Sequence, residues 1–262
     1  MTWRKLTKEA KKWVDNFKPS KIPKYRIKKG LPLRSANLLN DRSLLESLAA
    51  QCTNQKVPFP NNVYVGQTPF ANAWQLPIGN SYIFTEGIKK IETDGNPKLL
   101  DGIVAHEVAH TAQKTKHWMR GILQGGVFLI VFEGLNSLGK QIEKSEITIS
   151  KKVAKVFSNS IFRLTIAHLV SSYVGAKFNQ KKELNADKRA AKSTSPEIMI
   201  NSLTHVAKIN EPFELKIDNE SSPKEWVKYI SQKVIQPFPS HPSLEERVKY
   251  LKNLSNYQGL EK

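Results

Sequence analysis

Residues 96–110 read NPKLLDGIVAHEVAH and give the strongest indication of the fold. An Asn-Pro pair is typical of the N-cap and first turn of a helix, and the apolar residues after it predict a helix to about residue 116. Residues i and i+4 of a helix lie on one face about 6 Å apart, so His106 and His110 can bind one metal ion. Glu107 can then act as general base on a metal-activated water without being a ligand. The alternative is two surface histidines that share this spacing by chance.

A catalytic zinc site needs a third protein ligand beside two histidines. His117 lies seven residues after His110, about 10 Å further along a continuous helix, and is therefore out of reach. Glu133 is one candidate, but no second carboxylate lies near it in the sequence. Glu183 is followed one helical turn later by Asp187, and a carboxylate there can orient a ligand histidine through its free ring nitrogen. The sequence therefore favours Glu183 and leaves Glu133 as the alternative.

The rest of the chain predicts an α+β protein that is rich in helices. Short β-like runs at 63–65, 71–76 and 82–84 predict a small sheet before the long helix. Residues 18–34 contain three prolines and are expected to form an extended connection. Further helical patterns lie at residues 43–51, 121–139 and 153–176, around residues 183–187, and within residues 196–256.

The composition excludes several classes of protein. Of the 262 residues, 39% are hydrophobic and 24% charged, which is typical of a globular protein. The single cysteine, Cys52, excludes a disulfide scaffold and zinc fingers built on cysteine pairs. No apolar segment of about 7–15 residues follows the basic N-terminus, so a secretory signal is not expected.

The longest uncharged apolar runs, residues 121–132 and 164–176, contain 12 and 13 residues. That length favours a buried helix or an interfacial hairpin over a helix that crosses a bilayer. We therefore expect a cytoplasmic protein that is soluble or peripheral at a membrane.

Half of the positive charge is concentrated at the N-terminus. Residues 1–29 contain 11 basic side chains and two acidic ones, a net +9 of the chain's +18. An apolar stripe at helical spacing runs through them, and it either packs on the protein's own body or lies on an anionic membrane surface; nucleic acid is not the expected partner. We expect a basic arm and linker at residues 1–34 and one domain at residues 35–262. The stripe consists of Trp3, Leu6, Ala10, Trp13 and Phe17.

Four motifs in order resemble the zinc peptidase family that includes HtpX and the CAAX prenyl proteases. The resemblance implies a zincin-like fold of the gluzincin type, one Zn²⁺ per chain, and endopeptidase activity on protein or peptide substrates. It also implies His106, His110 and Glu183 as zinc ligands and Glu107 as general base. The motifs are NAWQLP at 72–77 with YIF at 82–84, HEVAH at 106–110, ELNAD at 183–187, and SHPSLEER at 240–247.

The resemblance assigns roles to residues near the expected zinc. Asp187 would support the site. His241 would lie close to the metal, where it can donate to the oxyanion or fill the open coordination position; the alternative is an ordinary loop histidine. Arg247 either pairs with Asp187 and fixes the geometry or is a solvated residue on a helix face.

Asn72, Ala73 and Trp74 belong to the strand that precedes the active-site helix in this family. Pro77 and Gly79 suit an edge strand, because proline cannot donate a hydrogen bond to a neighbouring strand. An edge strand offers backbone groups to an extended substrate, which would bind as an added strand. The alternative is a strand with no role in substrate binding.

The best-known members of that family are integral membrane proteins. Because this chain lacks uncharged runs of spanning length, we expect generic proteolysis and do not infer prenylated substrates. The alternative function is a zincin-fold binding module whose basic arm docks on anionic lipid or nucleic acid. Glu107 favours the enzyme, since a binding module needs no general base.

Overall fold

The computed structural model describes residues 6–19, 33–76, 80–93, 96–113, 116–144, 153, 155–211 and 241–259. The chain divides into two compact units, which are described separately. Unit 1 comprises Met1–Lys114, Glu183–Glu214 and Ser243–Lys262, and unit 2 comprises Thr115–Lys182 and Leu215–Pro242.

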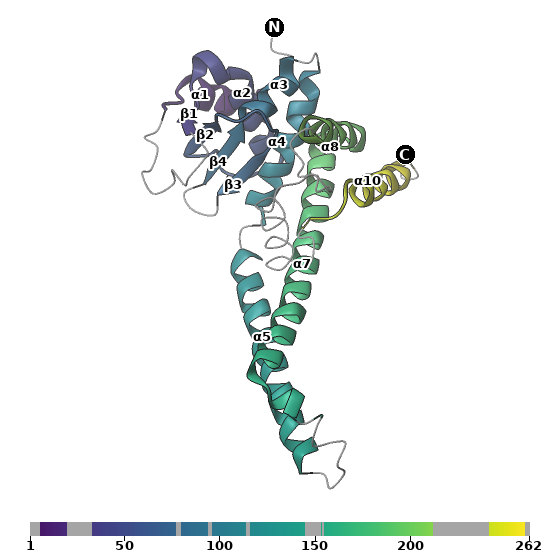
Figure 1. Ribbon diagram of the computed structural model, residues 1–262. Helices are drawn as coiled ribbons and strands as arrows, with labels where there is room; N and C mark the ends of the chain where they lie inside the picture. The colour runs from purple at the N-terminus through teal and green to yellow at the C-terminus, as the bar shows by residue number, and fades with distance from the viewer. Residues whose placement is uncertain are drawn as a thin grey trace, which may run out of the picture. The chain divides into compact units, whose positions relative to one another are not determined.

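Unit 1 contains a four-stranded sheet with the order β1-β2-β4-β3 (Figure 1). The central strands β2 and β4 are parallel, while β1 and β3 pair with them in antiparallel orientation. The three strands expected before the long helix are confirmed, but the stretch expected as an extended connection ends in a strand, β1. The strands are β1 (Leu33–Ser35), β2 (Asn62–Gly66), β3 (Ala73–Leu76) and β4 (Ser81–Thr85).

The predicted central helix is α4 (Pro97–Thr111), opened by Asn96, whose side chain accepts a hydrogen bond from the backbone N–H of Lys98. Nearly every residue of α4 is buried, including the charged or polar residues Asp101, His106 and Glu107. It ends at Thr111, five residues earlier than predicted, so His117 lies in the first turn of α5 and not at the end of α4.

Among the described elements, three helices of unit 1 and one strand pack directly on α4. Contacts join α4 to α2, α3, α8 and strand β3. Gly102 allows α8 to approach, since a Cβ atom there would overlap the Ser202 side chain. The elements are α1 (Lys8–Asp15), α2 (Leu38–Asn54), α3 (Glu86–Thr93), α8 (Pro196–Asn210), α10 (Leu244–Gly259), and the C-terminal part of α7 (Ser160–Ser193).

The apolar face of α1 packs on α2 and the core of unit 1. Ala10 and Val14 are fully buried, and Leu6 and Phe17 contact the core cluster. The ring of Trp13 stacks on Phe59 with centroids 5.5 Å apart. The stripe within the described residues therefore contacts the protein itself; Trp3 lies outside those residues, and the domain boundary at residue 34 stays a prediction.

A charged cluster joins β1, α2 and α3. Arg34 donates to both carboxylate oxygens of Asp41, at 2.5 and 2.8 Å, and to Glu86 at 2.8 Å, while Lys89 lies 2.9 Å from Asp41. Burial alone would raise the pKa of Asp41, but hydrogen bonds from Arg34, Lys89 and the backbone N–H of Asn37 outweigh it and lower the pKa. Asp41 is therefore a buried carboxylate that stays ionised in the folded protein.

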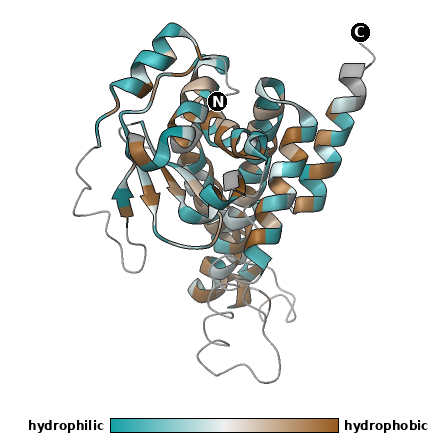
Figure 2. Ribbon diagram, turned by 90° about the horizontal axis from the view of Figure 1, so that it is seen from above, coloured by the Kyte–Doolittle hydropathy of each residue, from teal (hydrophilic) through white to brown (hydrophobic). Residues whose placement is uncertain are grey.

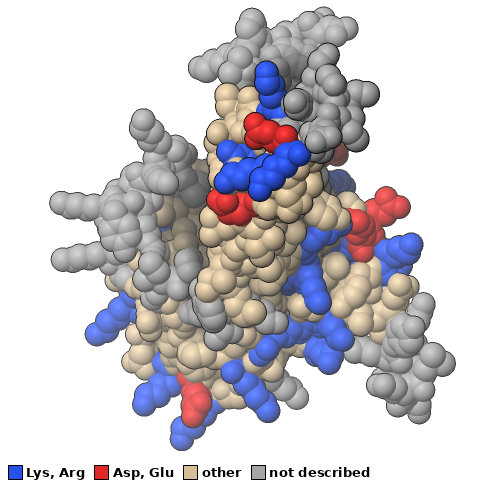
Figure 3. Space-filling model, turned by 90° about the horizontal axis from the view of Figure 1, so that it is seen from below, with Lys and Arg blue, Asp and Glu red and all other residues tan. Residues whose placement is uncertain are grey.

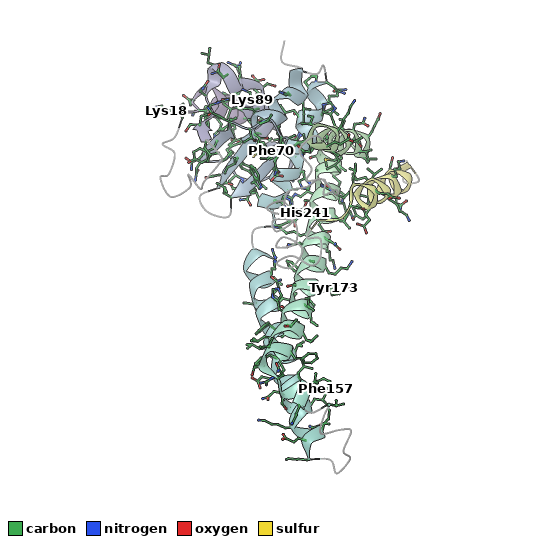
Figure 4. All side chains as sticks on the ribbon, in the orientation of Figure 1. Lys18, Phe70, Lys89, Phe157, Tyr173 and His241 are labelled. Carbon is green, nitrogen blue, oxygen red and sulfur yellow. The ribbon has the colours of Figure 1, made fainter. Side chains whose placement is uncertain are left out.

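Unit 2 contains α5 (Lys116–Glu143) and the N-terminal part of α7, which run side by side as a hairpin (Figures 1 and 4). Gln124 of α5 donates to the backbone oxygen of Ser171 at 3.3 Å, and a Cβ atom at Gly175 would overlap the Gln124 side chain. The guanidinium of Arg163 lies 4.7 Å from the centre of the Phe132 ring. A hydrogen bond, a close approach at Gly175 and a cation–π contact therefore join the two helices.

The hairpin is not buried, contrary to one of the two expectations for these apolar runs. Leu129, Ile130 and Ile161 are 61%, 74% and 75% exposed, and Figure 2 maps the hydropathy of each residue onto the ribbon. The segment Met119–Glu143 is long and apolar enough to cross a membrane, by length and composition alone. The uncharged run at residues 121–132 is shorter than this segment, because Glu133 ends the run but lies within the continuous helix α5.

Candidate active site

His106 and His110 project from one face of α4, as their spacing predicts. Their Nε2 atoms lie 3.1 Å apart, and the ring planes are nearly perpendicular at 89°. Together with Glu107 they offer possible ligand atoms that all lie within 4.8 Å of one another. Glu183 of α7 brings its Oε2 atom to 3.3 Å from His106 Nε2 and its Oε1 atom to 3.4 Å from His110 Nε2.

These distances fit a zinc ion. Tetrahedral coordination with zinc–ligand bonds of about 2.0–2.1 Å separates the ligand atoms by roughly 3.3 Å, and imidazole nitrogen with carboxylate oxygen is a common donor set. Burial alone would lower the pKa of His106, but hydrogen bonds to Asp187 and Glu183 outweigh it and raise the pKa to about 10. The carboxylates around this ring therefore stabilise a positive charge, which is the charge that a metal cation supplies.

Asp187 holds the far side of the His106 ring. Its Oδ1 atom lies 2.8 Å from His106 Nδ1, and Arg247 of α10 donates to both of its oxygens, at 2.6 and 2.8 Å. Burial alone would raise the pKa of Asp187, but the hydrogen bonds from Arg247 and His106 outweigh it and lower the pKa. The charged carboxylate favours a proton on Nδ1, which leaves Nε2 facing Glu183 as a donor atom for a metal.

Glu107 contacts the neighbouring strand. Its Oε2 atom accepts a hydrogen bond from the backbone N–H of Gln75 in β3 at 3.0 Å. Burial raises the pKa of Glu107, and the nearby Glu183 adds to this, although His106 and the Gln75 N–H act in the opposite direction. A carboxylate with a raised pKa is suited to accept and release a proton near neutral pH. The sequence did not reveal Gln75, because the contact is made by its backbone and carries no side-chain signal.

The register of β3 decides which backbone groups face outward. The backbone N–H of Thr85 in β4 donates to the oxygen of Asn72, and antiparallel pairs alternate, so Trp74 also pairs with β4. Ala73 and Gln75 therefore direct their backbone groups to the other side of the strand. In this structure Asn72 Oδ1 accepts from the Ala73 N–H at 2.8 Å. Within the described part of the chain β3 is an edge strand, whereas Pro77 and Gly79 lie outside it.

Two other candidate residues lie in unit 2. Glu133, the alternative third ligand, is exposed on α5, where Asn136 donates to it at 3.4 Å. His241 is an exposed residue just before α10, labelled in Figure 4. Its catalytic role stays a prediction, and the side chain of His117 lies outside the described residues.

Known proteins resemble this chain over most of its length. The sequence pattern of peptidase family M48 matches residues 39–255. Protease HtpX of Haemophilus influenzae strain PittGG is 23% identical over 224 residues, which cover 82% of this chain and 74% of that protein. The Glaesserella parasuis protein of the same name is 24% identical with the same coverage. Protease HtpX of Buchnera aphidicola is 28% identical over 159 residues, 58% of this chain and 53% of that protein, so the matched region spans about half of this relative.

Proposed function

Because this chain belongs to peptidase family M48, a family of metalloproteases, we propose that it is a zinc-dependent endopeptidase that hydrolyses peptide bonds of protein substrates. One observation carries the proposal. The Nε2 atoms of His106 and His110 lie 3.1 Å apart, and each has a different carboxylate oxygen of Glu183 at 3.3–3.4 Å, which fits the ligand spacing around one zinc ion. We do not assign Glu107 as a ligand, because its carboxylate accepts a hydrogen bond from the backbone N–H of Gln75 in β3.

In this proposal His106, His110 and Glu183 hold one Zn²⁺ per chain. When bound, zinc acts as a Lewis acid that polarises the peptide carbonyl and increases the acidity of water. Glu107 takes the proton of the attacking water and returns it to the leaving amine; burial raises its pKa toward the range that this exchange needs. Asp187 and Arg247 keep the His106 ring in its ligating orientation.

We assign substrate binding to the strand that begins next to Asn72. An extended peptide would pair with the outward backbone groups of Ala73, after Asn72 releases the Ala73 N–H, and with the backbone oxygen of Gln75, whose N–H stays with Glu107. Trp74 would contribute through its side chain, since its backbone pairs with β4. His241 is proposed to donate to the oxyanion of the tetrahedral intermediate, a role that rests on the family resemblance.

The direct test compares the wild-type protein with Glu107→Gln. The variant should retain about one zinc per chain, measured by mass spectrometry, because the ligands are unchanged. Casein hydrolysis should fall at least about 100-fold, which is the usual contribution of a general base. A chelator should abolish the wild-type activity, and added zinc should restore it. Undiminished hydrolysis by Glu107→Gln would remove Glu107 from the mechanism.

We also propose that the protein works at the cytoplasmic side of a membrane and that the hairpin of α5 and α7 contacts lipid. Exposed apolar side chains along both helices carry this proposal, because soluble proteins rarely expose a large contiguous apolar surface. Basic side chains outnumber acidic ones among those in view in Figure 3, in line with the formal net charge of +18, and this excess would favour an anionic lipid surface.

Salt and alkali washing of membranes that contain the protein separates two modes of attachment. Release by high salt would indicate attachment through basic side chains such as those of residues 1–29, because salt screens charge–charge attraction to the membrane surface. Resistance to salt and alkali, lost when Leu129 and Ile130 are replaced by Asn, would indicate insertion of the hairpin. A wild-type protein that stays in the soluble fraction throughout would refute both modes.

A further inference from the structure

We propose that Gln55 is a positioning residue that sets the distance between α4 and α7, the two helices that carry the three proposed zinc ligands. The proposal rests on the proposed function, since it concerns the geometry of the same metal site. It adds a residue that neither touches the metal ligands nor belongs to any motif of the sequence.

Gln55 links three helices through one side chain. It is the C-cap residue of α2 and is only 5% exposed. Its Nε2 atom donates to the backbone oxygen of Ala105 in α4 at 2.7 Å and lies 3.3 Å from Ser193 Oγ in α7. Its Oε1 atom accepts from Arg189 Nε in α7 at 3.2 Å. The one amide group therefore contacts α4 through Nε2 and α7 through both Nε2 and Oε1.

The backbone of Gln55 strengthens the same link. Arg189 Nη2 donates to its carbonyl oxygen at 2.5 Å, so one guanidinium contacts both the side chain and the main chain. The next residue, Lys56, has φ of 55°, in the left-handed region that favours glycine. Non-glycine residues persist in that region where surrounding contacts fix the backbone. The end of α2 is thus held in the conformation that presents Gln55 to both helices.

The positions that Gln55 contacts are adjacent to the metal ligands. Ala105 immediately precedes His106, and Arg189 follows Asp187 by two residues. The apolar side chains near these positions are small and fully buried, among them Ala105 and Ala190. Methyl groups pack without directional preference, so they do not fix the position of one helix along the other. The hydrogen bonds of Gln55 are directional and therefore fix the position of α7 along α4.

Other buried polar contacts fix α4 without involving α7. Ser47 of α2 donates to Asp101, and Ser202 of α8 donates to the backbone oxygen of Leu99. The α4 residues in these contacts, Asp101 and Leu99, lie further from the histidines along the helix than Ala105 does. We therefore expect loss of Gln55 to change the geometry of the donor set more than loss of either serine.

The test uses the full chain with Gln55→Leu, which keeps the volume and removes all side-chain hydrogen bonds. Competition with a chromogenic chelator should show zinc affinity reduced about 10–100-fold, the usual effect of losing a group that orients metal ligands. The visible spectrum of the Co²⁺-loaded variant should shift, because its bands report the arrangement of the ligands. With casein-derived peptides, kcat should fall while KM changes little, since β3 is not affected.

Asn210→Leu is the matched control. Its amide also bridges two backbone groups in unit 1, the N–H and oxygen of Ala71, at 2.7 and 2.8 Å. That variant should lower the melting temperature of the metal-free protein and leave zinc affinity and the Co²⁺ spectrum unchanged. Equal effects of the two variants on zinc affinity would mean that Gln55 acts through general stability alone.

Three outcomes separate the possible failures. If wild-type protein binds no zinc, the proposed function fails and the role of Gln55 fails with it. If wild-type protein binds zinc and Gln55→Leu binds it within twofold with the same Co²⁺ spectrum, only the positioning role is refuted. If Gln55→Leu does not fold, Arg189→Lys is the second variant, because Arg189 is half-buried and the substitution removes the guanidinium that donates to both Gln55 oxygens. Wild-type zinc affinity in Arg189→Lys would equally refute the proposal.

Discussion

Asp187→Asn tests whether the buried contact behind His106 matters for metal binding and for stability. The substitution keeps the size of the side chain and removes its charge. An asparagine oxygen facing His106 Nδ1 and Arg247 Nη2 preserves those contacts, but its NH2 group then meets Arg247 Nε, where the carboxylate oxygen now accepts at 2.8 Å. Two donors face each other, and the guanidinium loses its counter-charge.

The expected magnitude follows from burial. Asp187 is fully buried and the Arg247 side chain is only 15% exposed, so little water replaces the lost partner. Removing one partner of a buried ion pair destabilises a protein by about 3–5 kcal/mol. We expect a loss near the lower end of that range, because one oxygen remains. Zinc affinity should fall about 10–100-fold, because the His106 ring is less firmly oriented.

The assay combines urea unfolding of the metal-free protein with chelator competition for zinc. Arg247→Met in the Asp187→Asn background removes the uncompensated charge and should recover much of the stability but not the zinc affinity. Recovery of both quantities would mean that Asp187 acts only by neutralising Arg247. Unchanged stability and affinity in the single variant would refute the reasoning altogether.

Three further predictions concern metal ligation, acid stability and the N-terminal helix. Glu183→Ala should lower both zinc content and melting temperature, because bound metal stabilises the folded state, while Glu133→Ala should leave zinc content unchanged; the reverse result by mass spectrometry would make Glu133 the ligand. The partners of Asp41 lower its pKa, so its contribution to the free energy of unfolding is present above about pH 4 and is lost as the pH falls below that value. Urea unfolding at several pH values should show this loss in the wild type and not in Asp41→Asn, and parallel pH curves for the two proteins would refute the prediction. Deleting residues 1–19 should lower the melting temperature measurably, because α1 packs on the core; an unchanged value would show that its contacts contribute no stability.

The part of the site that rests on helical spacing could be predicted from the sequence. His106 and His110 share a face of α4 because four residues make about one turn wherever a helix forms. Glu183 and Asp187 were favoured on the same local argument, and their carboxylates lie beside the two rings. The two histidines needed only the identity of a helix and the positions within it, whereas the preference for Glu183 over Glu133 also drew on the family resemblance.

Contacts made by the backbone or across distant segments could not be predicted in this way. Gln75 reaches Glu107 through its N–H, a group that every residue except proline carries. Gln55 meets Arg189, 134 residues away, and nothing in either side chain indicates the other. Strand β1 was missed because three residues at the end of a proline-containing stretch show no clear alternation.

The insertion of the hairpin between the second histidine and Glu183 has a consequence for the entropy of the chain. Glu183 follows His110 by 73 residues, so a metal held by both residues closes a loop that contains the whole of α5 and most of α7. Closing a loop of this length restricts the unfolded chain by about 4 kcal/mol, by the same argument that applies to a disulfide. This term grows only with the logarithm of length, by about 0.6 kcal/mol for each doubling. Segments of very different length can therefore occupy this point in the chain at nearly the same entropic cost to a metal-linked site.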